Sequence, residues 1–152
     1  MQNILLQIPV GTTITLGTLD ETSGNLQNVT LLGVADFRVT VQMGSMAIMV
    51  PICKVTGVAG NGAAAAIIDA LVLQPPVDNT GECACCEDPV RRFLQTIATA
   101  DIDVLGPAFN NIQNATIIGV GEGIVKVQAA GLSSAALSIC QISQISDFTV
   151  GI

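Results

Sequence analysis

Apolar and polar residues alternate along two stretches of the chain. From Thr12 to Leu19, and again from Ala100 to Leu105, the alternation has the period of two that a half-buried strand requires. Polar and Gly-containing turns follow each opening strand. Each stretch then continues into a predicted β-hairpin, formed by 28–34 and 37–42 in the first stretch and by 114–120 and 124–128 in the second.

The two stretches align with each other when the sequence is shifted by 86 residues. Residues 25–34 then fall on residues 111–120, and six of these ten positions are identical. The match continues with 37–42 over 123–128 and, after one inserted residue, with 52–58 over 139–145. Three matched blocks in the same order indicate an internal repeat. The predicted organisation is a first β module at 1–59, a linker at 60–99 and a second β module at 100–152.

The last strand of each module is predicted at Ala47–Val58 and at Ala135–Ile145. Cys53 lies on the same face of the first of these strands as Val55, and Cys140 has the matching place in the second. Small apolar side chains on the core face of a strand are typical of structural thiols. We therefore expect Cys53 and Cys140 to be buried and unreactive.

The linker has a different composition. Its first part, 60–73, is rich in Ala, ends before Pro75-Pro76 and fits either a helix or an additional strand. Asp88-Pro89 is a helix-start signal, since Asp accepts hydrogen bonds from free N–H groups and Pro is tolerated at the first helical position. A short amphipathic helix is predicted near 89–98, with an apolar stripe of Val90, Phe93, Leu94 and Ile97.

Composition narrows the range of partners. Half of the residues are apolar and 11% are charged, yet no apolar run approaches the roughly 20 residues of a membrane-spanning helix. So few charges indicate that other copies of the chain cover part of the surface, which predicts a homo-oligomer or polymer. The net charge of −7 would repel phosphate backbones and anionic lipids, so neither nucleic acid nor a membrane is an expected partner.

The order of strand, turn, hairpin and a final strand reading Val-Pro-Ile-Cys-Lys-Val-Thr-Gly-Val at 50–58 resembles the small Sm-like barrels of spore coat proteins from endospore-forming bacteria. Those modules similarly end in an Ile-Pro-Ile-x-x-Ile strand. The resemblance covers about 10–58 and, more weakly, 100–146, where Leu137-Ser138-Ile139 replaces Val50-Pro51-Ile52. It implies a mainly β chain of two tandem Sm-like barrels with one short linker helix.

The resemblance also implies a structural role at the spore surface, alongside other coat-type proteins. Residues 1–10 lack the basic region and continuous apolar stretch of a signal peptide, so we expect synthesis in the cytoplasm. Deposition on the spore surface, or release as an extracellular assembly, would follow. RNA binding does not carry over from other Sm-like proteins, because the repeated loops offer Asn, Gln, Asp and Glu in place of basic and aromatic residues.

The linker also holds the most reactive segment, with Cys83, Cys85 and Cys86. The favoured interpretation is covalent crosslinking, in which each disulfide contributes about 2–4 kcal/mol. Five cysteines leave an odd thiol for a bond between chains. A metal site built from the same three cysteines is the alternative, although separated Cys-x-x-Cys pairs and His are missing. A redox role is disfavoured, because the neighbouring acidic residues oppose formation of a thiolate.

The remaining catalytic templates fail for lack of the required residue types. The chain has no His and no Tyr, so we expect neither an enzyme nor a cofactor. Asp101 and Asp103 are interpreted as a solvated strand edge, and Arg91 and Arg92 as the exposed face of the short helix. The predicted function is therefore a self-assembling structural subunit of a spore surface, fibre, ring or lattice. The alternative is a soluble adaptor or metal-binding module that uses the cysteine-rich linker.

Overall fold

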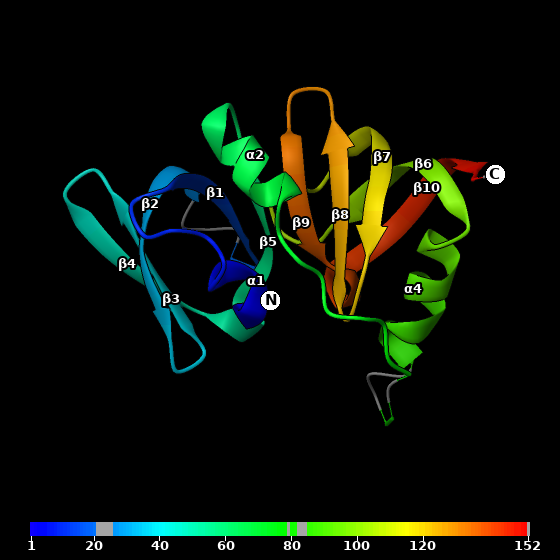
Figure 1. The fold of residues 1–152 in the computed structure, drawn as a ribbon, viewed down its shortest axis with the longest axis horizontal. Coiled ribbons are helices and arrows are strands. Elements are labelled where there is room, and N and C mark those ends of the chain that lie inside the picture. Colours follow the sequence, from blue (N-terminus) through cyan, green and yellow to red (C-terminus); the bar gives the residue numbers. More distant parts are fainter. Residues whose placement is uncertain (21–25, 79, 82–84, 152) are drawn as a thin grey trace.

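The computed structural model describes residues 1–20, 26–78, 80–81 and 85–151. Its strands form one ten-stranded antiparallel sheet (Figure 1). The first half of the chain, residues 1–60, contains β1 (Thr13–Thr18), β2 (Leu26–Ala35), β3 (Arg38–Met43), β4 (Met46–Pro51) and β5 (Val55–Gly60). The second half, residues 85–151, contains β6 (Ile97–Val104), β7 (Ile112–Val120), β8 (Ile124–Ala129), β9 (Ser133–Ser138) and β10 (Ile142–Val150).

Three short α-helices and two 3₁₀ turns complete the elements described here. The helices are α1 (Gln2–Leu5), α2 (Ala63–Asp69) and α4 (Asp88–Leu94), and the turns are η1 (Ile52–Lys54) and η2 (Ile139–Gln141). The mainly β prediction is therefore confirmed. None of the helices in the described part of the chain is long and apolar enough to cross a membrane.

Strand pairing in the first half recurs in the second. The pair Thr13↔Thr30 between β1 and β2 has its counterpart in Thr99↔Thr116 between β6 and β7. The irregularities recur as well, since the register of β2 against β3 shifts after Leu31 and that of β7 against β8 shifts after Ile117. Counterparts lie 86 positions apart up to Met43 and 87 positions apart from Met46 onward, because of the single inserted residue. The sequence repeat thus extends to the register of the strands.

The long final strand predicted for each module is wrong. In both halves a 3₁₀ turn breaks it, so that η1 separates β4 from β5 and η2 separates β9 from β10. The corner is needed because β4 pairs with β3 whereas β5 pairs with β1. Apolar residues continue through the corner, and hydrophobic period alone therefore does not reveal it.

A direct edge-to-edge pairing of β5 with β9 joins the two halves, with Gly57 opposite Leu137 and Gly60 opposite Ser134. The hydrophobic cores interlock across this junction. Ala136 of β9 packs in the cluster of the first half, and Ala59 of β5 packs in the cluster of the second. One continuous sheet therefore runs through both repeats.

Phe109 fills the contact between the halves. It lies in the loop between β6 and β7 and is 1% exposed. A Cβ atom at Gly17 would lie 2.5 Å from Cε2 of Phe109, and one at Gly57 would lie 2.9 Å from the same atom. Both distances are shorter than a real Cβ contact, so only glycine at these two positions leaves room for the ring.

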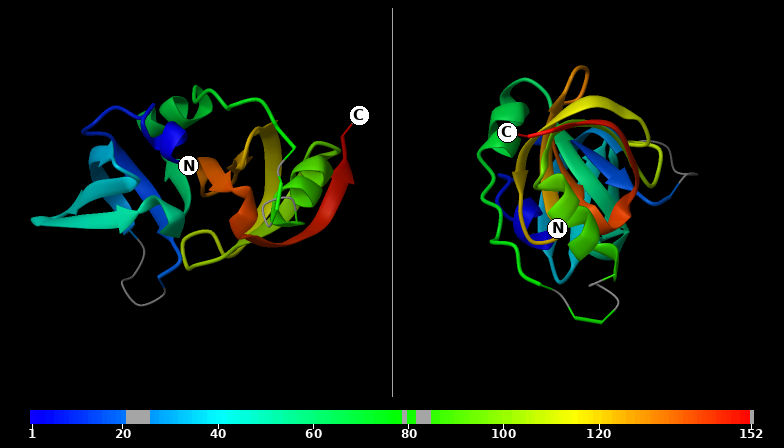
Figure 2. Two further views of the ribbon diagram at one scale, coloured as in Figure 1. Left: turned by 90° about the horizontal axis from the view of Figure 1, so that it is seen from below. Right: turned by 90° about the vertical axis from the view of Figure 1, so that its right-hand side faces the viewer.

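The Ala-rich segment is a helix, which settles the choice left open by its sequence. α2 packs against β5 and β9 and is held by the second half through polar contacts. Nζ of Lys126 donates to the backbone oxygens of Asp69 (2.7 Å) and Leu71 (2.9 Å), near the end of α2 where a positive charge is favoured. Ser134 donates to the Asp69 carboxylate at 2.6 Å. Figure 2 shows α2 and the segment that follows it on one side of the molecule.

The predicted helix near 89–98 is present but shorter. α4 ends at Leu94, and Ile97 is the first residue of β6. Leu94 is fully buried, and Val90 and Phe93 pack against the cluster of the second half. Thr96 accounts for the early end, because its backbone and hydroxyl both donate to the Phe93 carbonyl oxygen (2.9 and 2.7 Å) and the chain then turns into the strand.

We expect Phe109→Ala to destabilise the protein by about 3–5 kcal/mol, since it removes a fully buried ring and leaves a cavity that Gly17 and Gly57 cannot fill. The matched control is Phe37→Ala, which removes the same ring from a side chain that is 72% exposed and should change stability by less than about 0.5 kcal/mol. Urea unfolding followed by circular dichroism measures both. Equal losses for the two variants would contradict the role assigned to Phe109.

Candidate functional site

The structure places the cysteine segment directly before α4. Cys83 lies outside the described residues, while Cys85 and Cys86 are exposed. Exposure makes these two thiols accessible to another chain. Across residues 1–20, 26–78, 80–81 and 85–151, no three His, Cys, Asp or Glu side chains are grouped so that they could hold a metal ion.

The prediction that Cys53 is a buried thiol is wrong, because Cys53 is exposed. Its counterpart Cys140 is half-buried. Both residues occupy the middle of a 3₁₀ turn, at η1 and η2, where side chains no longer alternate between two faces as they do in a strand. The face assigned to Cys53 from a continuous strand therefore does not apply.

Arg91 is not on an exposed helix face as predicted, since it is only 5% exposed. One of its guanidinium nitrogens lies 3.0 Å from a carboxylate oxygen of Asp78 and 3.4 Å from one of Asp88. Arg92 remains exposed and donates to the same Asp78 oxygen at 3.0 Å. Hydrogen bonds from Arg92, which has the larger effect, and from Arg91 hold the pKa of the Asp78 carboxyl below its ordinary value.

Two further acidic side chains, Glu87 and Asp101, accept hydrogen bonds from the backbone. Glu87 is buried and accepts a hydrogen bond from the backbone N–H of Gly123 at 2.7 Å. Asp101 accepts one from the backbone N–H of Asn114 at 2.6 Å, at a residue whose φ is +50°. The interpretation of Asp101 and Asp103 as a solvated strand edge is therefore wrong, because β6 lies between β10 and β7 and both residues are half-buried. Asp101 has a structural role, since it supports a position of β7 with positive φ.

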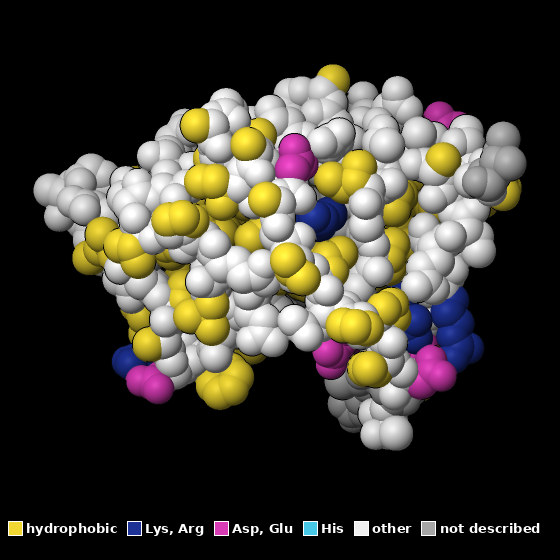
Figure 3. All heavy atoms as spheres, viewed as in Figure 1, with side chains coloured by type: hydrophobic (Ala, Val, Ile, Leu, Met, Phe, Trp, Pro, Cys, Tyr) yellow, Lys and Arg dark blue, Asp and Glu magenta, His cyan; other side chains and the backbone are white. Residues whose placement is uncertain are grey.

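The two ends of the sheet are open edges that the sequence did not reveal. β4 and β10 are the terminal strands, and each pairs with only one neighbour. Large apolar side chains are exposed on both: Met46 (57%) and Met49 (55%) on β4, and Phe148 (49%) and Val150 (73%) on β10. Figure 3 shows few charged groups over the face that it displays, with hydrophobic side chains spread across it.

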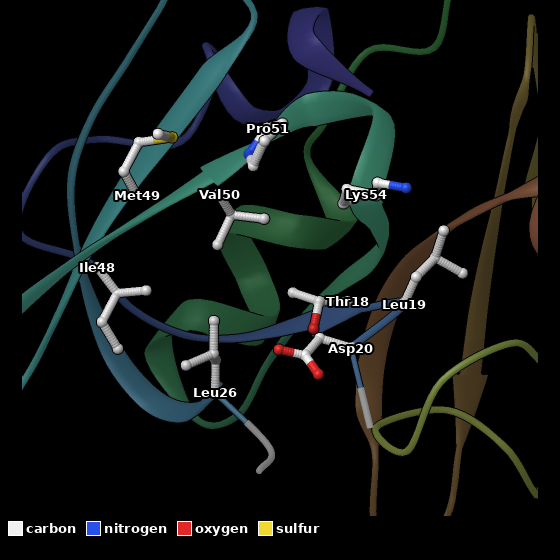
Figure 4. A pocket seen from close by; sticks show the side chains of 9 residues that line it. All are labelled: Thr18, Leu19, Asp20, Leu26, Ile48, Met49, Val50, Pro51 and Lys54. Atoms are coloured by element: carbon white, nitrogen blue, oxygen red, sulfur yellow. The ribbon is translucent and has the colours of Figure 1, made fainter. Parts of the chain in front are cut away.

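A pocket of about 440 Å³ lies beside the edge strand β4. Its apolar wall consists mainly of Leu26, Ile48 and Val50, and Thr18 and Asp20 lie on the opposite side (Figure 4). Lys54 from η1 completes the rim. The pocket and the β4 edge are continuous, so a chain that paired with β4 would also cover the pocket.

Phe148 limits the length of the free edge on β10. Its ring meets the ring of Phe93 on α4 edge to face, with centroids 4.9 Å apart and planes at 89°. Asp147 directly before it has a φ of +44°, and the register of β10 against β6 shifts between Ser146 and Thr149. The straight part of the β10 edge therefore ends near Asp147.

Comparisons with protein-family models, curated proteins and solved structures found no match to this chain.

We expect Cys53 to react with a thiol reagent in the folded protein. The measurement uses a chain in which Cys83, Cys85 and Cys86 are replaced by Ser, so that only Cys53 and Cys140 remain. One thiol should then react promptly without denaturant, and the prompt phase should disappear on adding Cys53→Ser. If Cys140→Ser abolishes the prompt phase instead, the exposure assigned to the two turns is reversed.

Proposed function

We propose that this protein is a self-assembling structural subunit, built from a duplicated small Sm-like β-barrel module, that associates with further copies of itself. The observation that supports the proposal is the pair of unpaired edge strands, β4 and β10, at opposite ends of one sheet. An open edge presents a row of unpaired backbone N–H and C=O groups, which is a template for another strand.

The composition of the two edges supports association. Soluble proteins commonly protect such edges with Lys residues or interior Pro. Neither β4 nor β10 contains Lys, and Pro51 is the last residue of β4. The one charged residue on these two strands, Asp147, lies where β10 bends, so the stretch of β10 before it is unprotected by charge. Both edges expose large apolar side chains, and covering them gains roughly 25 cal/mol per Å² of apolar surface removed from water.

Disulfides between subunits would stabilise the assembly once it has formed. Cys85 and Cys86 are exposed directly before α4, which lies at the opposite end of the molecule from β4 (Figure 1), so a strand paired with β4 would leave them accessible. Deposition on a spore surface, with other coat-type proteins, is the setting that the family resemblance implies for such a material.

Purified protein is expected to form large particles, and reduction should shorten their lifetime without preventing their formation, because strand edges carry the contact. Light scattering and electron microscopy, with and without reductant, test this. A monodisperse monomer at every concentration and redox state would contradict the proposal. A monomer carrying about one equivalent of zinc or copper after anaerobic purification would instead favour the adaptor function.

A further inference from the structure

The junction inside the chain shows how an edge strand of one repeat pairs with an edge strand of the other. β5, the fifth strand of the first half, pairs with β9, the fourth strand of the second half. The two strands left unpaired at the ends of the sheet are the counterparts of this pair. β4 is the counterpart of β9, and β10 is the counterpart of β5. Each chain therefore has one unpaired edge of each kind: β4 offers the edge that matches β9, and β10 offers the edge that matches β5.

We propose that β10 of one copy pairs with β4 of the next copy in the register in which β5 pairs with β9. This inference rests on the proposed function and specifies its contact. Transferring the internal pairs to their counterparts gives four new pairs between chains: Gln144 with Val50, Ile145 with Met49, Ser146 with Ile48, and Asp147 with Ala47. The pairing ends at Asp147, where β10 bends, as the internal pairing ends at Gly60.

The pocket beside β4 has a counterpart that is filled within the chain. Gly106 is the counterpart of the pocket residue Asp20, and it packs against the backbone of Thr18 and Leu19 from the first half. The counterparts of Thr18 and Leu19 are Val104 and Leu105. Leu105 is 46% exposed, whereas Leu19 is half-buried at the junction. Leu105 of the incoming copy is therefore the side chain that meets the pocket.

The proposed register places the two exposed methionines of β4 in different environments. Ala136 is fully buried because it packs in the core of the other half, and its counterpart Met49 is 55% exposed. Ser133 remains exposed next to the junction, and its counterpart Met46 is 57% exposed. Docking of a second copy would bury Met49 in that copy and leave Met46 in solvent. Docking therefore changes the exposure of one methionine of β4 and leaves that of the other unchanged.

At the first of the four pairs, the sizes of the two residues change in opposite directions between the internal and the proposed contact. Inside the chain Gly57 lies opposite Leu137, and a Cβ at Gly57 would lie 2.9 Å from a methyl carbon of Leu137. Between copies, Gln144 takes the place of Gly57 and the smaller Val50 takes the place of Leu137. The larger side chain on one strand is offset by the smaller one on the other.

The contact is head to tail, because it joins two different surfaces. Every chain then contacts the next one in the same way, which gives a ring where the rotation between neighbours closes and a filament where it does not. A two-fold symmetric contact, in which β4 meets β4 or β10 meets β10, does not.

Blocking one edge at a time tests the direction. Met49→Asp blocks the β4 edge by placing a charge at a position that docking buries, and Leu105→Asp blocks the β10 side. Each variant alone should remain a 15.6 kDa monomer by light scattering, under conditions in which the wild type assembles. Mixed at equal concentration, they should form a dimer of twice that mass, because each supplies the edge that the other lacks.

The controls are Met46→Asp on β4 and Val150→Asp on β10, which place the same charge on the two edge strands but outside the paired residues. Both should assemble like the wild type, and circular dichroism should show all four variants folded. If Met49→Asp still assembles, or if either blocked variant dimerises alone, the head-to-tail contact is wrong while self-assembly stands. A wild-type chain that never assembles would instead overturn the proposed function.

A disulfide trap tests the register even when the contact is short-lived. In a chain with all five cysteines replaced by Ser, Ile145→Cys and Met49→Cys place thiols on opposed residues, at the spacing that a cross-strand disulfide needs. Oxidation should give a ladder of multimers on a nonreducing gel. Ile145→Cys with Met46→Cys, three residues out of register, should give mainly monomer. Equal ladders from both pairs would overturn the register.

Discussion

The rest of the structure depends on the packing of the Phe109 ring against Gly17 and Gly57. Each repeat is small, and a small module buries only a limited core of its own. The Phe109 ring enters the first half from a loop of the second, at a place where β1 and β5 carry no side chain. Together with the pairing of β5 and β9, this contact lets Ala136 and Ala59 cross into each other's core. Two marginal modules thereby become one structural unit.

The basic residues are distributed in a way that the net charge of −7 does not show. Of the five in the chain, Lys126 is 9% exposed and Arg91 is 5% exposed. Lys126 holds the end of α2, and Arg91 ties Asp78 to α4, so both are used to fix the linker. Arg38, Lys54 and Arg92 remain at the surface. Among the described residues, the acidic Glu87 (8% exposed) and Asp88 (7% exposed) are buried as well, so burial removes as many negative as positive charges from the surface. In the proposed assembly, the net negative charge of each copy opposes association, which therefore relies on backbone pairing and apolar contact.

Local pattern predicted the strands, the hairpins and α4, because alternation, turn residues and the Asp88-Pro89 signal all lie within a few residues of the element they specify. It did not predict the break at Ile52–Lys54, since apolar residues continue through the corner, and the wrong face for Cys53 followed from that error. Arg91 is buried where it pairs with Asp78, which lies 13 residues earlier in the chain, so the pattern of the helix itself does not predict its burial. Which strands are left at the edges depends on the order of all ten strands in the sheet, and the pattern of neighbouring residues carries no information about that order.

The two repeats differ at the positions that accept Phe109. Gly17 and Gly57 accept Phe109 inside the chain, whereas their counterparts Asp103 and Gln144 carry polar side chains that leave no room for such a ring. A contact between copies therefore lacks the buried aromatic ring that the internal junction has, and it must be the weaker of the two. In the proposed assembly, the junction within each chain is therefore permanent and the contact between copies is reversible. Such a difference in strength would let each chain fold first and associate afterwards.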